Sequence, residues 1–491
     1  MIELLVAASF ASLPRLAPVL ERFSRLGKLT WFGESPSTVA SNFLAAPKIA
    51  DIAELEAGSS LILLVAFQAG EVVSGHEGGQ VLRVVERHSN AVAVGEATLV
   101  VDDFAQLELL AKIQDYPGFS QLLQCRGWTA SDFRSAVLDR YGAAIEALQT
   151  QRRAAIFGAQ RLGEKVEESL RAAGIMPVAF IDNNPSKHGS NINGLPVLSL
   201  SALSDKSIPI VIATTRFTSS ITRQLGREGF RHILPYSVMS LVDEPRYPDE
   251  IPYVGIQQDF AEHWVRYLGL FLALSDEKSR DVLDGLVHYR LNYDARMADA
   301  VADDYARQYF DAELVEFDGK DVFVDLGGYD GDTAEKFIQY SGGAYAKIYI
   351  FEPDKNLLRR AAGRLQAYKA VEFVSAGAYS RDGDLRFSAS GRTNGAISDV
   401  GELVIPIRKL DSAINEAPTL IKMDIEGAET EALLGAANLL RAVRPKLAIA
   451  AYHDAPDLWR LVDVVREINP SYRFYLRHYS ETGLESVIYA V

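Results

Sequence analysis

Apolar and polar positions along the chain predict alternating strands and helices, and changes in this pattern divide the sequence into four parts. Residues 1–150 begin with strand-like runs and continue at helical spacing, and their role stays open. Residues 151–240 repeat the order strand, turn, helix, strand, which predicts a Rossmann-like α/β domain. Residues 241–310 open with a Pro-rich linker and predict helices that form a linker or lid. Residues 311–491 again alternate strands and helices, ending in a pair of strands that suits an antiparallel hairpin.

The best-defined element is a strand, turn and helix around residues 322–337. The strand is short and apolar, and it stops where Gly327 and Gly328 break its regularity. A helix with an apolar stripe follows, and Asp332 or Thr333 can cap its first turn. The glycines let the backbone approach a ligand closely, and the start of the helix offers N–H groups to a carboxylate or phosphate. This turn is typical of a nucleotide-cofactor site.

The charge of the turn favours one class of cofactor. Asp325, Asp330 and Asp332 follow one another with no Lys or Arg between them, so a pyrophosphate would be repelled. S-adenosylmethionine carries an ammonium and a sulfonium beside its single carboxylate, and acidic side chains can hold those cations. Glu352 ends the next strand about 20 residues beyond the turn, where an acidic residue accepts hydrogen bonds from ribose hydroxyls. We therefore expect S-adenosylmethionine rather than NAD.

Composition narrows the class of protein. A length of 491 residues predicts about two to four domains, and a net charge of -15 argues against a nucleic-acid partner. The one cysteine, Cys125, excludes an internal disulfide framework and fits a reducing compartment. The N-terminus lacks the basic start of a signal peptide, and the longest apolar runs are too short to span a membrane. We expect a soluble cytoplasmic protein, with the oligomeric state open and a homo-oligomer possible.

A second glycine turn lies at residues 153–182. Gly158 and Gly163 follow a strand, Arg161 would tolerate phosphate, and the next strand ends on Asp182. Gln160, however, stands where a dinucleotide fold needs its second glycine. Residues 153–235 resemble the small Rossmann-like domain at the front of sugar acyltransferases and nucleotide-sugar-modifying enzymes. This resemblance implies a module that binds a nucleotide or nucleotide-sugar, or one that only scaffolds.

Seven short motifs follow one another in the last 230 or so residues. They are QYF at 308–310, VDLGGYDGDT at 324–333, FEPD at 351–354, IKMDIEGAE at 421–429, AAYHDAPDLW at 450–459, RHYS at 477–480 and LESVIYA at 484–490. In this order, over residues 260–491, they resemble the FkbM family of S-adenosylmethionine-dependent methyltransferases. The resemblance implies a class I methyltransferase fold, a doubly wound sheet with strand order 3-2-1-4-5-7-6. It also implies methyl transfer to a hydroxyl of a saccharide, a nucleotide-sugar or another small metabolite.

The resemblance also assigns the donor site by position. The turn should hold the methionine part of the donor, Glu352 the ribose, and residues 377–379 the adenine. The cofactor-binding residues expected on these grounds are Asp325, Gly327, Gly328, Tyr329, Asp330, Gly331, Thr333, Glu352 and Ala378.

The acceptor side should lie where the fourth and fifth strands of the same sheet end. Asp424 and His453 follow these strands, and we predict both as catalytic, with His453 as the general base that accepts the hydroxyl proton. The predicted acceptor-binding residues are Glu426, His478 and Glu485. Glu429 is better explained as a carboxylate at a helix N-terminus.

A divalent metal held by Asp424, His453 and Asp454 is conceivable from their ligand types. Their spacing matches no recognised metal signature, so no metal is predicted. Two other functions stay open. The chain could be a non-catalytic nucleotide or sugar sensor that keeps the methyltransferase fold as a scaffold. It could also be an NAD-dependent sugar reductase that uses the Gly158 turn, which Gln160 and the lack of a Tyr-x-x-x-Lys couple weaken.

Overall fold

The structure is a computed structural model. It describes residues 2–7, 29–32, 48–49, 61–66, 81–86, 98–101, 106, 109–110, 112–243, 245–247, 255–387 and 403–491. Most of the predicted Pro-rich linker, residues 244–252, lies outside this part of the chain. Among the helices described, none combines the length and apolar character that a membrane crossing requires. The chain divides into two compact units, Met1–Asp139 with Ile256–Ala273 and Leu283–Asn292, and Arg140–Gly255 with Leu274–Val282 and Tyr293–Val491.

The first unit contains a parallel sheet of six strands in the order β3-β2-β1-β4-β5-β6. The strands are β1 Ile2–Ala7, β2 Leu29–Phe32, β3 Lys48–Ile49, β4 Leu61–Ala66, β5 Val81–Glu86 and β6 Thr98–Val101. Parallel neighbours need crossover connections, and the helices predicted between these strands lie outside the described residues. The strand-like runs of the sequence therefore form a sheet, as their apolar character predicts.

The other elements that the structure describes in the first unit are helices. They are η2 Ile113–Asp115, α4 Pro117–Gln124, most of α5 Ala130–Arg140, α10 Ile256–Ala273 and the second part of α11 Glu277–Asn292. Helix α4 contacts α11 closely, because the backbone N–H of Phe119 donates to Asp284 Oδ1 at 2.9 Å. Cys125 is buried, and burial raises the pKa of its thiol to about 11. The thiol therefore stays protonated, as expected of a small apolar core residue.

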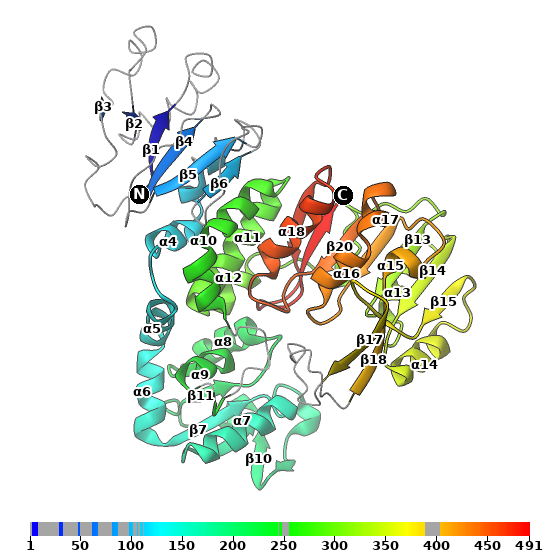
Figure 1. The fold of residues 1–491 in the computed structure, drawn as a ribbon. Helices are drawn as coiled ribbons and strands as arrows, with labels where there is room; N and C mark the ends of the chain where they lie inside the picture. Colours follow the sequence, from blue (N-terminus) through cyan, green and yellow to red (C-terminus); the bar gives the residue numbers. More distant parts are fainter. Residues whose placement is uncertain are drawn as a thin grey trace. The chain divides into compact units, whose positions relative to one another are not determined.

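The second unit begins with a Rossmann-like sheet in the order β12-β11-β7-β8-β10-β9, whose strands are parallel except for the edge strand β9 (Figure 1). Its strands are β7 Arg153–Phe157, β8 Met176–Ile181, β9 Asn191–Ile192, β10 Leu195–Leu198, β11 Ile210–Ile212 and β12 Ile233–Pro235. Its helices are α6 Gly142–Gln151, α7 Arg161–Ala172, η3 Pro185–Lys187, η4 Leu200–Ala202, α8 Thr218–Arg227 and α9 Tyr236–Val242.

The C-terminal domain of the second unit is built on seven strands in the order β15-β14-β13-β19-β20-β22-β21, which is 3-2-1-4-5-7-6 when numbered along the domain. They are β13 Val322–Leu326, β14 Lys347–Phe351, β15 Val371–Val374, β19 Leu420–Met423, β20 Lys446–Ala450, β21 Phe474–His478 and β22 Ser486–Ala490. The first five are parallel, and β22 runs antiparallel to both β20 and β21. The parallel-dominated α/β class is the one that the sequence predicts.

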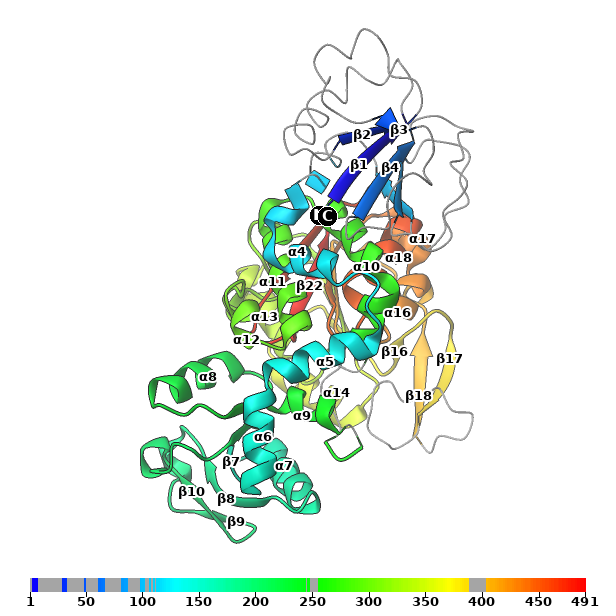
Figure 2. The same cartoon turned by 90° about the vertical axis from the view of Figure 1, so that its left-hand side faces the viewer.

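Helices accompany this sheet at each crossover (Figures 1 and 2). The crossover helices are α13 Asp332–Tyr340, α14 Lys355–Arg364, α15 Leu410–Ala413, α16 Glu429–Gly435, α17 Ala437–Ala442 and α18 Asp457–Ile468. Two further helices, α12 Ala295–Asp299 and η5 Tyr305–Arg307, precede β13. A small sheet joins β16 Gly377–Ala378, β18 Leu403–Arg408 and β17 Gly383–Phe387. Phe323 of β13 stacks on Phe337 of α13 with ring centroids 4.5 Å apart. The apolar stripe predicted for α13 therefore faces the sheet.

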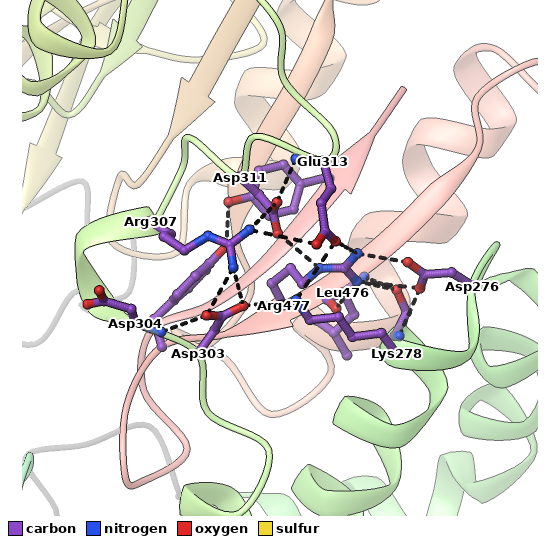
Figure 3. Close-up of polar contacts among 12 residues, drawn as sticks. Asp276, Lys278, Asp303, Asp304, Arg307, Asp311, Glu313, Leu476 and Arg477 are labelled. Atoms are coloured by element: carbon purple, nitrogen blue, oxygen red, sulfur yellow. Dashed lines mark hydrogen bonds and ion pairs between the residues drawn. The ribbon is translucent and has the colours of Figure 1, made fainter.

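An ion-pair network fixes the segment before β13 against the C-terminal hairpin (Figure 3). The Arg477 side chain on β21 is 1% exposed, and its guanidinium lies 3.1 Å from Asp311 and 2.7 Å from Asp276. Arg307 joins the same network through Asp303 and Asp311, at 3.2 and 3.0 Å. Buried arginine with two carboxylates is stable only when its geometry is satisfied. The network thereby positions residues 303–313, which lead into the candidate site.

Candidate active site

The first part of the site is the turn from β13 to α13. A Cβ atom on Gly327 would lie 1.9 Å from the backbone oxygen of Asp424, and one on Gly328 would lie 2.3 Å from Ile350. These glycines therefore let the turn pack between the ends of β19 and β14. They do so whether or not a ligand is bound.

The aspartates of the turn have cationic partners that come from distant parts of the sequence. Asp325 and Lys422 are both buried, and their charged groups lie 3.0 Å apart. Asp330 lies 2.7 Å from Arg360 and 3.1 Å from Arg364, both on α14. The argument that unpaired acids select a cationic cofactor is therefore wrong for these two residues, because their charges are already compensated.

Lys422 pairs with Asp325 and also stabilises the backbone of the turn. Its ammonium donates to the backbone oxygens of Leu326 at 3.2 Å and Gly327 at 2.7 Å. Burial raises the pKa of Asp325, although Lys422 opposes this shift. Burial lowers the pKa of Lys422, but Asp325 outweighs it and leaves that pKa raised. The proton therefore stays on the lysine, and the pair is ionic.

The helix cap differs from the prediction. Gly331 is the N-cap of α13, with a left-handed backbone at φ 85°, and no side chain caps the helix. Asp332 is exposed and accepts the N–H of Thr333, at 2.8 Å, inside the first turn. Neither Asp332 nor Thr333 is the cap, because glycine alone takes this conformation without strain. The start of α13 is thus open to an anionic group.

Glu352 lies against the turn at the end of β14. Its carboxylate accepts the backbone N–H of Tyr329 at 3.1 Å and that of Asp354 at 2.9 Å. The side chain of Tyr329 is exposed beside it. Burial raises the pKa of Glu352, and the two N–H donors oppose this. Strand pairing thus brings Glu352 and the turn together, as predicted. Ala378 is buried in β16, paired with Arg408 of β18.

A second cluster lies where β19 and β20 end. Asp424 Oδ1 lies 3.2 Å from His453 Nε2, and Glu429 Oε1 lies 3.0 Å from His453 Nδ1. The hydroxyl of Tyr309 donates to Asp424 at 2.8 Å, and that of Tyr452 does so at 3.3 Å. The predicted pair of Asp424 and His453 is therefore brought together in one acidic cluster with Glu426 and Glu429. Parallel neighbouring strands end at the same edge of the sheet, which is why their following residues meet.

Two carboxylates flank His453, one at each ring nitrogen. Burial lowers the pKa of His453, but the carboxylates of Asp424 and Glu429 outweigh burial and raise it well above its usual value. The role of His453 as general base stays a prediction. Glu429 begins α16 and also accepts the N–H of Ile425 at 2.9 Å, so it is both a helix-end carboxylate and a partner of His453.

The three predicted acceptor-binding residues differ in accessibility. The side chain of Glu426 is 68% exposed, and its carboxylate lies 3.7 Å from His453. Glu485 is bonded to Gln308 at 2.6 Å and lies 3.8 Å from Arg216. His478 is fully buried in β21, with Nδ1 at 2.9 Å from Ser486. His478 is the last residue of β21, directly before the turn of the hairpin, and its side chain is buried there. Its role in acceptor binding stays a prediction.

Backbone strain is concentrated around these two clusters. Among the described residues, nine other than glycine have positive φ, and four of them are Tyr309 at 68°, Tyr329 at 46°, Glu426 at 60° and Glu485 at 62°. Such conformations cost about 1–3 kcal/mol each and persist where surrounding structure enforces them, often at functional sites. The strained residues therefore support one site that includes both the glycine turn and the acidic cluster around His453.

Sequence reasoning did not identify Lys422, Tyr309 and Tyr452 as site residues. Tyr309 and Lys422 lie inside the motifs QYF and IKMDIEGAE, and Tyr452 directly precedes His453. Their presence in these motifs was the available signal. Their partners could not be assigned, because Tyr309 reaches Asp424 from 115 positions earlier in the chain.

The Gly158 turn of the Rossmann-like domain is also occupied by its own side chains. Asp182 accepts the N–H of Ala159 at 3.0 Å and lies 2.8 Å from Lys187. A Cβ on Gly163 would lie 1.9 Å from the backbone oxygen of Gly158, so this glycine lets α7 pack onto β7. Gln160 is the N-cap of α7. The turn thus has the helix-packing glycine of a Rossmann domain, but a side chain at its second glycine position.

The fold and the site define a doubly wound α/β domain of the methyltransferase type. Residues 325–477, less than half of the chain, match the family model described as Methyltransferase FkbM domain. The resemblance noted from the motifs is confirmed by this match. No curated protein matches the chain at a significant level.

The fold is shared with a solved structure. A methyltransferase FkbM from Methylobacillus flagellatus KT has 22% sequence identity and a TM-score of 0.56, and the alignment covers 73% of this chain and 100% of that chain. A rRNA methylase from Streptococcus thermophilus has 16% identity and a TM-score of 0.25, covering 36% of this chain and 89% of that chain. Fibrillarin from Aeropyrum pernix, in complex with S-adenosyl-L-methionine, has 14% identity and a TM-score of 0.26, covering 36% and 70%.

Proposed function

We propose that the chain is an S-adenosylmethionine-dependent methyltransferase that methylates a hydroxyl of a saccharide, a nucleotide-sugar or another small hydroxylated metabolite. The observation that carries this proposal is the convergence of Glu352, the glycine turn and the Asp424–His453 cluster at one edge of the sheet of an FkbM methyltransferase domain. When bound, the donor supplies an electrophilic methyl group. A cytoplasmic location is part of the proposal, because a single cysteine fits a reducing compartment.

The residues of the turn fit this donor. Each carboxylate oxygen of Glu352 accepts one backbone N–H, which leaves acceptor capacity for ribose hydroxyls. The uncapped start of α13 suits the carboxylate of the methionine part. Asp325 supports the turn through Lys422 instead of holding a cation of the donor. Ala378 is kept as the predicted adenine contact.

The acidic cluster of Asp424, Glu426, Glu429 and His453 would hold the acceptor. All three carboxylates lie near His453, but Asp424 and Glu429 are closer to it, at 3.2 and 3.0 Å, than Glu426 at 3.7 Å, and the side chain of Glu426 is the most exposed of the three. We therefore assign proton acceptance from the acceptor hydroxyl to Glu426. Asp424 and His453 would orient the acceptor, since a fixed acceptor geometry supplies much of the rate of such a transfer.

The Rossmann-like domain supports a saccharide or nucleotide-sugar acceptor. The loop after β11 and the first turn of α8 contact the turn between β21 and β22: Thr482 donates to the backbone oxygen of Thr215 at 2.8 Å, and the N–H of Ser220 in α8 donates to Glu481 at 2.7 Å. Arg216 of the same loop lies 3.8 Å from Glu485. Ligands of open α/β sheets bind at the ends of parallel strands. The module could thus present a bound acceptor to the methyl site.

The test is methyl transfer by the whole chain to a panel of nucleotide-sugars and free saccharides, with amines and thiols of similar size as controls. We expect S-adenosylhomocysteine and an O-methylated saccharide, identified by mass spectrometry. Glu426→Gln should lower turnover by about 10²-fold, the usual contribution of a positioned base, with donor binding unchanged. Glu431→Gln, on the same helix region, is the matched control and should keep wild-type turnover. Failure to bind the donor, or methylation of amines or thiols alone, would overturn the proposal.

A further inference from the structure

Asp424, Glu429 and His453 place three metal-ligating side chains together where β19 and β20 end. One atom from each, a carboxylate oxygen or an imidazole nitrogen, lies within 4.8 Å of the others. The sequence pointed to Asp454 as a third ligand, but its carboxylate lies 2.9 Å from Arg460. The third side chain of the cluster is instead Glu429, the first residue of α16.

One oxygen of this cluster has no hydrogen-bond partner. The side chain of Glu429 is 1% exposed, and its Oε1 atom is occupied by the N–H of Ile425 and by His453. Its Oε2 atom is buried and accepts no hydrogen bond. A buried anionic oxygen without a donor is costly. This atom therefore marks a position at which a cation would lower the free energy of the folded chain.

The local charges agree with this. Asp424 and Glu429 carry two negative charges, and the carboxylate of Glu426 lies 3.7 Å from His453. Lys422 does not balance this charge, because its ammonium pairs with Asp325 and donates hydrogen bonds to backbone oxygens of the turn. The single imidazole supplies at most one positive charge. The acidic cluster around His453 thus has an excess of negative charge that a divalent ion would balance.

We propose that Asp424, Glu429 and His453 bind a divalent cation. Two carboxylates and one imidazole suit Mn²⁺ among the ions that prefer oxygen ligands. His453 can give one nitrogen to the ion while the other keeps a carboxylate partner, which is how metal-binding imidazoles are commonly oriented.

This inference rests on the proposed function, because the ion would act on the same acceptor. A hydroxyl bound to a divalent ion loses its proton more easily. The ion would therefore activate the acceptor hydroxyl, with Glu426 beside it to take the proton. Three protein ligands leave further positions on the ion for an acceptor oxygen and water.

The test is titration of the metal-free whole chain with MnCl₂, followed by electron paramagnetic resonance of free and bound Mn²⁺. We expect one Mn²⁺ per chain, and nitrogen coupling from the imidazole in the pulsed spectrum. Glu429→Gln should weaken binding at least 10-fold, as should Asp424→Asn, whereas Glu431→Gln should bind as the wild type does. Circular dichroism of each variant identifies any that fails to fold.

The outcomes separate this inference from the proposed function. Absence of Mn²⁺ binding, or of nitrogen coupling in the wild-type spectrum, overturns the metal site even if a variant does not fold. Donor binding measured by calorimetry in chelator-treated protein reports separately on the turn and Glu352. A chain that binds the donor but no Mn²⁺ keeps its proposed function and loses the metal site. A chain that binds Mn²⁺ but no donor keeps the metal site and loses its proposed function.

Discussion

Replacing Lys422 with methionine tests how the glycine turn is held. The Lys422 side chain is 3% exposed and the Asp325 side chain 0% exposed, so removing the lysine leaves a buried carboxylate without its partner at 3.0 Å. Breaking such a pair costs about 3–5 kcal/mol. Two hydrogen bonds to backbone oxygens of the turn are lost as well. We expect Lys422→Met to destabilise β13 and the turn by this amount at pH 7.

The loss of stability in Lys422→Met should depend on pH, because a proton bound to the carboxylate of Asp325 removes its unpaired buried charge. Protonating a carboxyl of ordinary pKa costs about 4 kcal/mol at pH 7 and about 1.5 kcal/mol at pH 5. The folded variant then binds a proton that the unfolded chain does not, so its stability rises relative to wild type as the pH falls. The effect of Lys422→Met should therefore be smaller at pH 5 than at pH 7.

Hydrogen exchange of peptides covering β13 and β19 measures this cost locally in the whole chain. Lys347→Met on the neighbouring strand β14 is the control, because Lys347 forms a partly exposed pair with Glu372 at 2.8 Å and should cost less than about 1 kcal/mol. The double variant Asp325→Asn with Lys422→Met should recover part of the loss. Equal protection in the two Lys→Met variants, or a loss independent of pH, would refute this account of the pair.

Two further predictions concern the backbone and the ion-pair network. Gly327→Ala should destabilise the domain by more than about 3 kcal/mol, since its Cβ would meet a backbone oxygen at 1.9 Å, whereas Gly343→Ala, at φ 78° in open space, should cost only about 1–2 kcal/mol of strain. Thermal unfolding compares the two, and similar losses would contradict the packing role of Gly327. Arg477→Met should cost about 3 kcal/mol, because the buried carboxylate of Asp311 loses one of its partners. Hydrogen exchange in residues 303–313 should rise, and unchanged exchange there would show that Arg477 does not hold this segment.

Local pattern predicted the elements that carry the site. The strand at Val322–Leu326, the helix after it and the C-terminal hairpin are each encoded by short apolar periodicities. The meeting of Asp424 and His453 also followed from the sequence, because residues after parallel neighbouring strands share one edge of a sheet. These features need no knowledge of distant side chains.

Charge partners could not be predicted in the same way. The turn was interpreted as acidic because its own residues are, but Lys422 and Arg360 come from other elements and neutralise it. The burial of His478 depends on which face of β21 points inward, which a motif does not state. The second carboxylate beside His453 comes from Glu429, which the sequence placed only at a helix end. In each case tertiary packing supplied the deciding partner.

The central claim is that Glu352 and the turn beside it form the donor site of a methyltransferase. Calorimetric titration of the purified chain with S-adenosylmethionine tests it most directly, with Glu352→Gln compared to Glu372→Gln, an exposed glutamate on the neighbouring strand β15. We expect one donor bound per chain, at least 10-fold weaker binding in Glu352→Gln, and unchanged binding in the control. Absence of binding to the wild type, or equal affinity in both variants, would contradict the claim.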